Sequence, residues 1–156
     1  MHWRAWITDS YKSRPAELRP DFRDGAPPAE LTAVEAALGV ALPPPLRELL
    51  LESDGVDESM HHENEWFAIS THVWSCQEIA EENRRIRSDP EGPRPPAEGG
   101  RIPLYISNAG VDGILFAMMI RADSVEDPAI YAYYPIEAEW VCVSATLAAH
   151  LQGWKV

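Results

Sequence analysis

The sequence predicts a single domain of the α+β class, in which a mostly antiparallel sheet is covered by helices. The chain has 156 residues, a usual length for one domain. Periodic apolar residues, caps and turns predict helices, one strand, a helix, several consecutive strands and a final helix, in that order. Consecutive strands flanked by helices are typical of an antiparallel sheet in the α+β class.

The first 28 residues are expected to form an extension that packs on the domain. Apolar residues at its start, Trp3 and Trp6 among them, could form a short helix or strand. A polar segment follows, and Pro27-Pro28 marks the boundary. The main domain is therefore expected over residues 29–156.

Two short helices with defined ends are predicted next. Apolar residues recur at helical spacing up to Leu38, and Gly39 supplies a left-handed C-terminal stop. The second helix begins with prolines, which are favourable where no amide donor is needed, and Asp54-Gly55 ends it.

Caps and turns place the remaining elements. Ser75 and Glu78 form a capping box that begins a third helix. Ser144 is expected to cap a last helix over Ala145–Leu151. A polar loop is expected at 61–64, and strands are expected at 66–69, 102–107, 114–120, 129–134 and 138–143.

The N-terminus has neither the apolar region nor the cleavage site of a secretion signal, so a cytoplasmic location is expected. In that compartment Cys76 and Cys142 are expected to be free, buried thiols.

The net charge of −12, from 13 basic and 25 acidic residues, argues against binding nucleic acid or anionic membranes. The charge is compatible with a basic protein partner. Acidic residues without an intervening basic residue run from Glu48 to Glu82, and a second acidic tract runs from Asp123 to Glu139.

An acidic residue, Leu-Gly, Leu-Pro, a leucine-rich helix and Asp-Gly follow one another over Glu35–Gly55. This order resembles the opening signature of the SMI1/KNR4 (SUKH) family. The likeness continues at Trp74 and in the glycine-containing turn before Asp112, although Val111 stands where the family commonly has glycine. The resemblance implies an α+β fold and a protein-binding function. Bacterial relatives are commonly immunity proteins that block toxins, often nucleases, whereas eukaryotic relatives serve as regulatory or scaffold proteins.

The resulting hypothesis is an immunity protein that covers the active site of a basic toxin domain with an acidic face. The alternative is a regulatory scaffold unrelated to toxins. Two simpler interpretations remain open. The acidic stretch could be a solvated surface without a partner, and Trp66 could be a core residue of its strand. The candidate contact residues are Asp54, Asp57, Glu58, Glu63, Glu65, Trp66 and Asp112.

Catalysis, a cofactor and a metal are not expected, because the sequence lacks the common catalytic and nucleotide-binding motifs. Three weaker possibilities are a Cys76–His72 nucleophile and base, a catalytic Asp112, and metal binding by the loop from His61 to Glu65.

Overall fold

The computed structural model describes residues 1–95, 100–110, 112–121 and 127–153 and confirms the α+β class. These residues form five α-helices, one 3₁₀ turn and seven strands. The helical elements are α1 (Trp3–Ser10), η1 (Tyr11–Ser13), α2 (Pro28–Leu38), α3 (Pro44–Glu52), α4 (Cys76–Ser88) and α5 (Leu147–Gln152). The strands are β1 (Leu18–Phe22), β2 (Val56–His62), β3 (Glu65–Val73), β4 (Arg101–Ala109), β5 (Ile114–Arg121), β6 (Ile130–Tyr134) and β7 (Glu139–Ser144).

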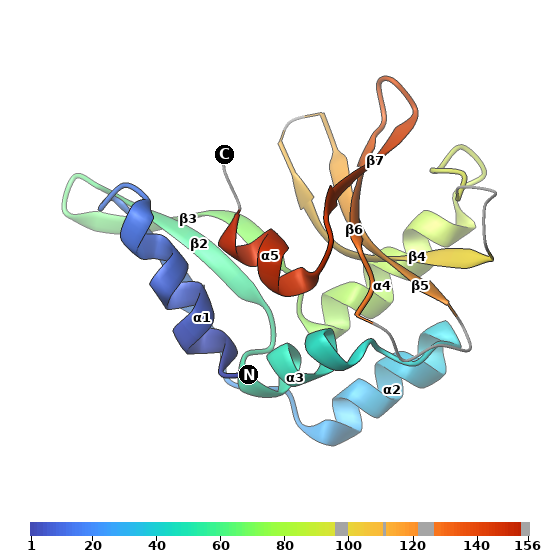
Figure 1. The fold of residues 1–156 in the computed structure, drawn as a ribbon, viewed down its shortest axis with the longest axis horizontal. Coiled ribbons are helices and arrows are strands. Elements are labelled where there is room, and N and C mark those ends of the chain that lie inside the picture. Colours follow the sequence, from blue (N-terminus) through green and yellow to red (C-terminus); the bar gives the residue numbers. More distant parts are fainter. Residues whose placement is uncertain (96–99, 111, 122–126, 154–156) are drawn as a thin grey trace.

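The strands form two antiparallel sheets, one with the order β1-β2-β3 and one with the order β4-β5-β6-β7. They meet where β3 ends, because the Trp74 amide donates to the Ile106 carbonyl of β4 at 2.8 Å. From this junction the β2–β3 hairpin and the four-stranded sheet diverge as two arms, and α5 lies between them (Figure 1).

Helix α4 is fastened to the four-stranded sheet by a buried asparagine. The Asn83 amide donates to the Tyr105 carbonyl at 2.8 Å, and its side-chain oxygen accepts the Tyr105 amide at 2.9 Å. Because these bonds satisfy both polar ends of the buried side chain, they fix how α4 lies on β4.

The predicted helix pair is confirmed together with its ends. Gly39 adopts the left-handed conformation, with φ of 67°, immediately after α2. The Glu35 carboxylate then holds the crossing to α3, because it accepts the Leu42 amide at 2.9 Å and pairs with Arg47. The leucines of the pair supply core: Leu31, Leu46, Leu49 and Leu50 are fully buried.

The capping box at Ser75 and Glu78 is also confirmed, but the cap of the last helix is not Ser144. Strand β7 continues through Ser144, and the Thr146 hydroxyl accepts the Ala149 amide at 3.1 Å instead. None of the helices in the described ranges is long and apolar enough to cross a membrane.

Two strands lie where the sequence predicted none. Residues 18–22 form β1, so part of the N-terminal segment is an edge strand of the first sheet. Residues 56–62 form β2, which includes His61 and His62 of the predicted loop. The turn itself is only Glu63 and Asn64, whose positive φ values of 49° and 65° reverse the chain.

Candidate partner-binding site

Several acidic residues between Glu48 and Glu82 have partners inside the fold. Glu52 accepts the amides of Trp3 and Arg4, at 2.8 and 3.0 Å, and so satisfies the start of α1. Glu78 completes the capping box of α4 and also accepts from Arg23 at 3.0 Å. Several carboxylates of this stretch are therefore committed to holding elements of the fold.

Asp57 is one of the predicted contact residues, and it too has internal partners. Arg23 donates to its carboxylate from two nitrogens, at 3.0 and 3.1 Å, and the Thr71 hydroxyl donates at 2.7 Å. The side chain is 22% exposed. These bonds tie β2 to β3 and to the segment before α2.

Glu58 lies inside the molecule, with only 2% of its side chain exposed. The Tyr11 hydroxyl donates to its carboxylate at 2.5 Å, and the nearest nitrogens of His72 and Arg14 each lie 3.4 Å away. Burial alone would raise the pKa of Glu58, but the hydrogen bonds of His72 and Tyr11 and the Arg14 charge lower it below 4.5. Its position removes Glu58 from the outer surface proposed for it.

Glu63, Glu65 and Trp66 stand at the exposed end of the β2–β3 hairpin. Trp66 is 37% exposed, so it is not a core residue. The Arg19 guanidinium lies 4.1 Å from the centre of its ring, and the His61 ring lies 5.1 Å away on the same side of the sheet. Trp66 therefore lies on the opposite face of the hairpin from Met60 and Phe67.

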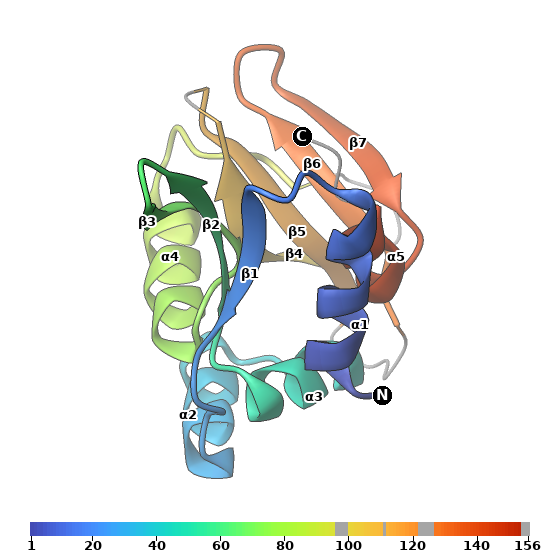
Figure 2. The ribbon, with the colours of Figure 1, turned by 90° about the vertical axis from the view of Figure 1, so that its left-hand side faces the viewer.

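A groove of about 570 Å³ lies between the two arms. Its walls come from β2–β3 and from the four-stranded sheet, and α5 closes one end. The lining residues are Glu58, Ile69, Ser70, Ala109, Gly110, Ile114, Phe116, Tyr134, Val143, Ser144, His150 and Gly153. Figure 2 shows the three-stranded sheet standing in front of the four-stranded sheet, with α1 and α5 along one side.

Exposed apolar side chains extend the hairpin wall of the groove toward the β2–β3 turn. Met60 lies two residues beyond Glu58 on β2, so both point to the same face, and Phe67 lies directly opposite Met60. Met60, Phe67 and Ile69 are 38, 46 and 46% exposed. The chain thus leaves a row of large apolar side chains open to solvent.

The opposite wall carries a similar row. Phe116 lines the groove and pairs with Ala132, which in turn pairs with Val141, so Val141 faces the groove as well. Val141 and Val143 are 41 and 39% exposed. Facing rows of uncovered apolar side chains are a feature of surfaces that bind other molecules.

Each arm carries an acidic residue on its groove face near the end of the strand. Glu65 lies two residues before Phe67 on β3, and Glu139 lies directly opposite Tyr134, which lines the groove. Both glutamates are exposed. The groove therefore has apolar walls and a negative charge at the rim of each arm.

Asp112 is exposed in the turn between β4 and β5 but contributes to a different hollow. That hollow, of about 430 Å³, also includes Arg85, Asp89 and Tyr133 and lies on the α4 side of the sheet. The seven predicted residues are thus not brought together. Of these seven, Glu65 at the start of β3 faces the groove from an exposed position, and the sequence did not predict the apolar walls.

A histidine closes the floor of the groove. His150 of α5 is buried and packs against the Phe116 ring, with the ring centres 5.2 Å apart. Burial, with a smaller contribution from the charge of His72, lowers the pKa of His150 to about 4. The side chain is therefore neutral at pH 7.

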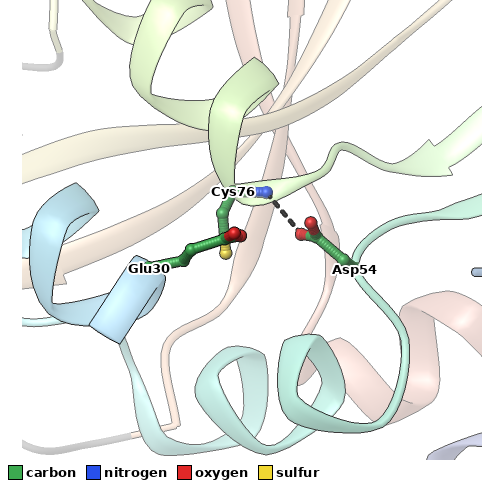
Figure 3. A group of neighbouring side chains, drawn as sticks. All are labelled: Glu30, Asp54 and Cys76. Atoms are coloured by element: carbon green, nitrogen blue, oxygen red, sulfur yellow. Dashed lines mark hydrogen bonds between the residues drawn. The ribbon is translucent and has the colours of Figure 1, made fainter. Parts of the chain in front are cut away.

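A second cluster, Glu30, Asp54 and Cys76, brings three possible metal-ligand atoms within 4.8 Å of one another (Figure 3). Asp54, however, accepts the Cys76 amide at 2.7 Å and so satisfies a donor in the first turn of α4. Burial, followed by the charge of Asp54, raises the pKa of the Cys76 thiol to about 12. A protonated thiol is a poor ligand and a poor nucleophile. A role in holding the start of α4 therefore accounts for this cluster better than metal binding does.

The nucleophile-and-base pairing of Cys76 with His72 is not favoured by the geometry either. His72 directs Nε2 at the Tyr11 hydroxyl, 2.6 Å away, and at Glu58. The expectation that both thiols are buried is wrong for Cys142, which is exposed on β7.

A protein-family model matches most of the chain. The model of the SMI1 / KNR4 family (SUKH-1) matches residues 25–153. A comparison with curated proteins found no significant match. The matched range includes both walls of the groove, and the chain belongs to the SMI1/KNR4 (SUKH-1) family.

Proposed function

We propose that this protein is an immunity protein, which binds a toxin domain in the cytoplasm and blocks its active site. The mechanism is steric and electrostatic, without a chemical step or a cofactor. Family membership supports a protein-binding role of this type. The observation that carries the proposal is the groove, because its two apolar walls are left uncovered by the residues that the structure describes.

Uncovered apolar walls give a partner a source of binding free energy. Full burial of a large aliphatic or aromatic side chain stabilises by about 1.5–3 kcal/mol. The five wall residues Met60, Phe67, Ile69, Val141 and Val143 are each 38–46% exposed. Covering what remains exposed therefore contributes up to about 1 kcal/mol for each residue before the costs of association.

The charges select the kind of partner. Glu65 and Glu139 stand at the rims of the groove, and the chain carries a net charge of −12. A basic domain is attracted to such a surface, and the attraction raises the association rate and fixes the orientation. Nuclease toxins fit this requirement, because a site that binds a polyanion is basic.

Co-expression with a toxin domain tests the proposal, and the genes next to this one are searched first for such a domain. The wild-type protein is expected to restore growth and to copurify with that domain as a stable complex. A toxin domain that stays toxic and forms no complex with the purified protein contradicts the proposal. A stable complex with a protein that has no toxic activity favours the regulatory scaffold instead.

A further inference from the structure

Strand β7 has one edge at which no described strand pairs with it. It is the outermost strand of the four-stranded sheet, and in the described residues it pairs only with β6 (Figure 2). Alternate backbone N–H and C=O groups of an edge strand point away from the sheet and can pair with another strand. Native proteins commonly protect such an edge with charged side chains or a covering segment. The middle of β7, Trp140–Val143, has no charged residue.

The same strand forms the outer part of one groove wall. Val141 faces the groove through its register with Ala132 and Phe116, and Val143 and Ser144 line the groove where the pairing with β6 shifts by one residue. Cys142 lies between the two valines and pairs with Tyr131, which places it on the other face of the sheet. A segment added at this edge would therefore lie along the groove.

We propose that the part of the toxin domain held in the groove is an extended segment that adds as a strand to the free edge of β7. Its alternate apolar side chains pack against Val141 and Val143, and Lys or Arg residues flank them beside Glu137 and Glu139. Backbone pairing at an edge gives affinity, and the alternating side chains give specificity. This inference rests on the proposed function and specifies how the partner binds.

Charge decides between this occupant and a second copy of the chain. A second copy would bring another molecule of net charge −12 to this edge, and its own β7 offers no basic residue to Glu137 and Glu139. Repulsion between two strongly acidic molecules opposes their association. A basic segment converts the same residues into a source of attraction, so it fits this edge better than another copy does.

Two variants of β7 separate strand addition from simple charge attraction. Val143→Asp places a carboxylate on the groove face, and Cys142→Asp places the same carboxylate on the adjacent residue of the opposite face. The probe is the purified toxin domain that the wild-type protein neutralises on co-expression, and the measurement is its association and dissociation with each variant. Thermal unfolding of each free variant checks that it remains folded.

Strand addition predicts that Val143→Asp raises the dissociation rate about tenfold, because a buried valine contact is lost, whereas Cys142→Asp leaves it near the wild-type value. Charge attraction alone predicts that both variants associate somewhat faster and dissociate as the wild type does. Equal dissociation rates for both variants therefore overturn strand addition while leaving the proposed function intact. Failure of the wild-type protein to bind the toxin domain overturns both.

Hydrogen exchange of the wild-type protein supplies a readout that does not depend on any variant being folded. Amides of β7 that point away from β6 are expected to exchange at least tenfold more slowly in the complex with the toxin domain, because added backbone bonds protect them. Unchanged exchange across Glu139–Ser144 in a saturated complex overturns strand addition.

Discussion

The Tyr11 hydroxyl and the Glu58 carboxylate form a 2.5 Å hydrogen bond that ties the η1 turn to the middle of β2. Arg14 extends the link, since it lies 3.4 Å from the same carboxylate and donates to the Leu151 carbonyl of α5 at 3.2 Å. The hairpin arm, the N-terminal segment and α5 are thereby joined at the floor of the groove. This arrangement fixes the hairpin arm relative to α5.

Removal of the buried carboxylate is expected to destabilise the protein strongly. Glu58→Ala leaves the largely buried Arg14 charge without its carboxylate partner and removes the acceptor of the Tyr11 hydroxyl, which costs about 3 kcal/mol or more. Glu81→Ala, at an exposed position of α4, is expected to change the free energy of unfolding by no more than about 0.5 kcal/mol. Urea unfolding measures both, and equal losses in the two variants contradict a structural role for Glu58.

The stability of the protein is expected to fall between about pH 6.5 and pH 4 because of His150. Its pKa is lowered to about 4 in the folded chain, whereas the unfolded side chain takes up a proton near its ordinary value of 6.5. The unfolded state thus binds more protons in this window, and the free energy of unfolding decreases by up to about 3 kcal/mol as the pH falls.

The variant His150→Phe is expected to lose most of this dependence, and His2→Gln, at an exposed histidine, is expected to retain it. Unfolding curves recorded at half-unit intervals of pH measure the difference. A His150→Phe variant with the wild-type slope between pH 6.5 and 4 contradicts the assignment to this side chain.

The two thiols are expected to react at very different rates. Cys142 is exposed, whereas Cys76 is buried and its pKa is raised to about 12. A thiol-specific disulfide reagent at pH 8 is expected to modify one thiol per folded chain rapidly and the second only after unfolding. Cys142→Ser is expected to abolish the rapid phase, and its persistence in that variant contradicts the placement of the thiols.

The carboxylate of Asp54 is expected to act as a helix cap and not as a metal ligand. Asp54→Ala leaves the Cys76 amide without its acceptor and is expected to cost about 1 kcal/mol, while Asp24→Ala, an exposed neighbour, is expected to be near neutral. A chelator is expected to leave the thermal midpoint of the wild-type protein unchanged. A lower midpoint in the chelator, restored by zinc, contradicts this role.

Elements with local signals could be predicted from the sequence. Gly39 ends α2, and Ser75 with Glu78 begins α4, because each of these signals acts within a few residues of the chain. Strand β2 was missed, because acidic, histidine and serine residues give it no apolar alternation. It is a strand through its pairing with β1 and β3, which are distant from one another in the sequence.

The groove could not be predicted, because alternation identifies an apolar face and does not say what covers it. Phe67 and Ile69 alternate with Trp66 and Ala68, a pattern that fits a core-facing strand equally well. The contiguous acidic run was misleading because residues that are neighbours in the sequence need not share a surface in the fold. Only the fold reveals that Asp57 and Glu58 have partners inside the molecule, while Glu65 faces the groove.

The rate of association with the toxin domain that the protein neutralises on co-expression tests the central claim most directly. The variant in which Glu65→Lys and Glu139→Lys are combined reverses the charge at both rims. The control combines Glu48→Lys on α3 with Glu81→Lys on α4, two exposed glutamates that do not line the groove, so both variants change the net charge equally. At low salt the rim variant is expected to associate about tenfold more slowly than the wild type, with a weaker dependence on salt, and the control much less so. An association rate equal to that of the wild type at low salt would contradict binding of a basic partner at this groove.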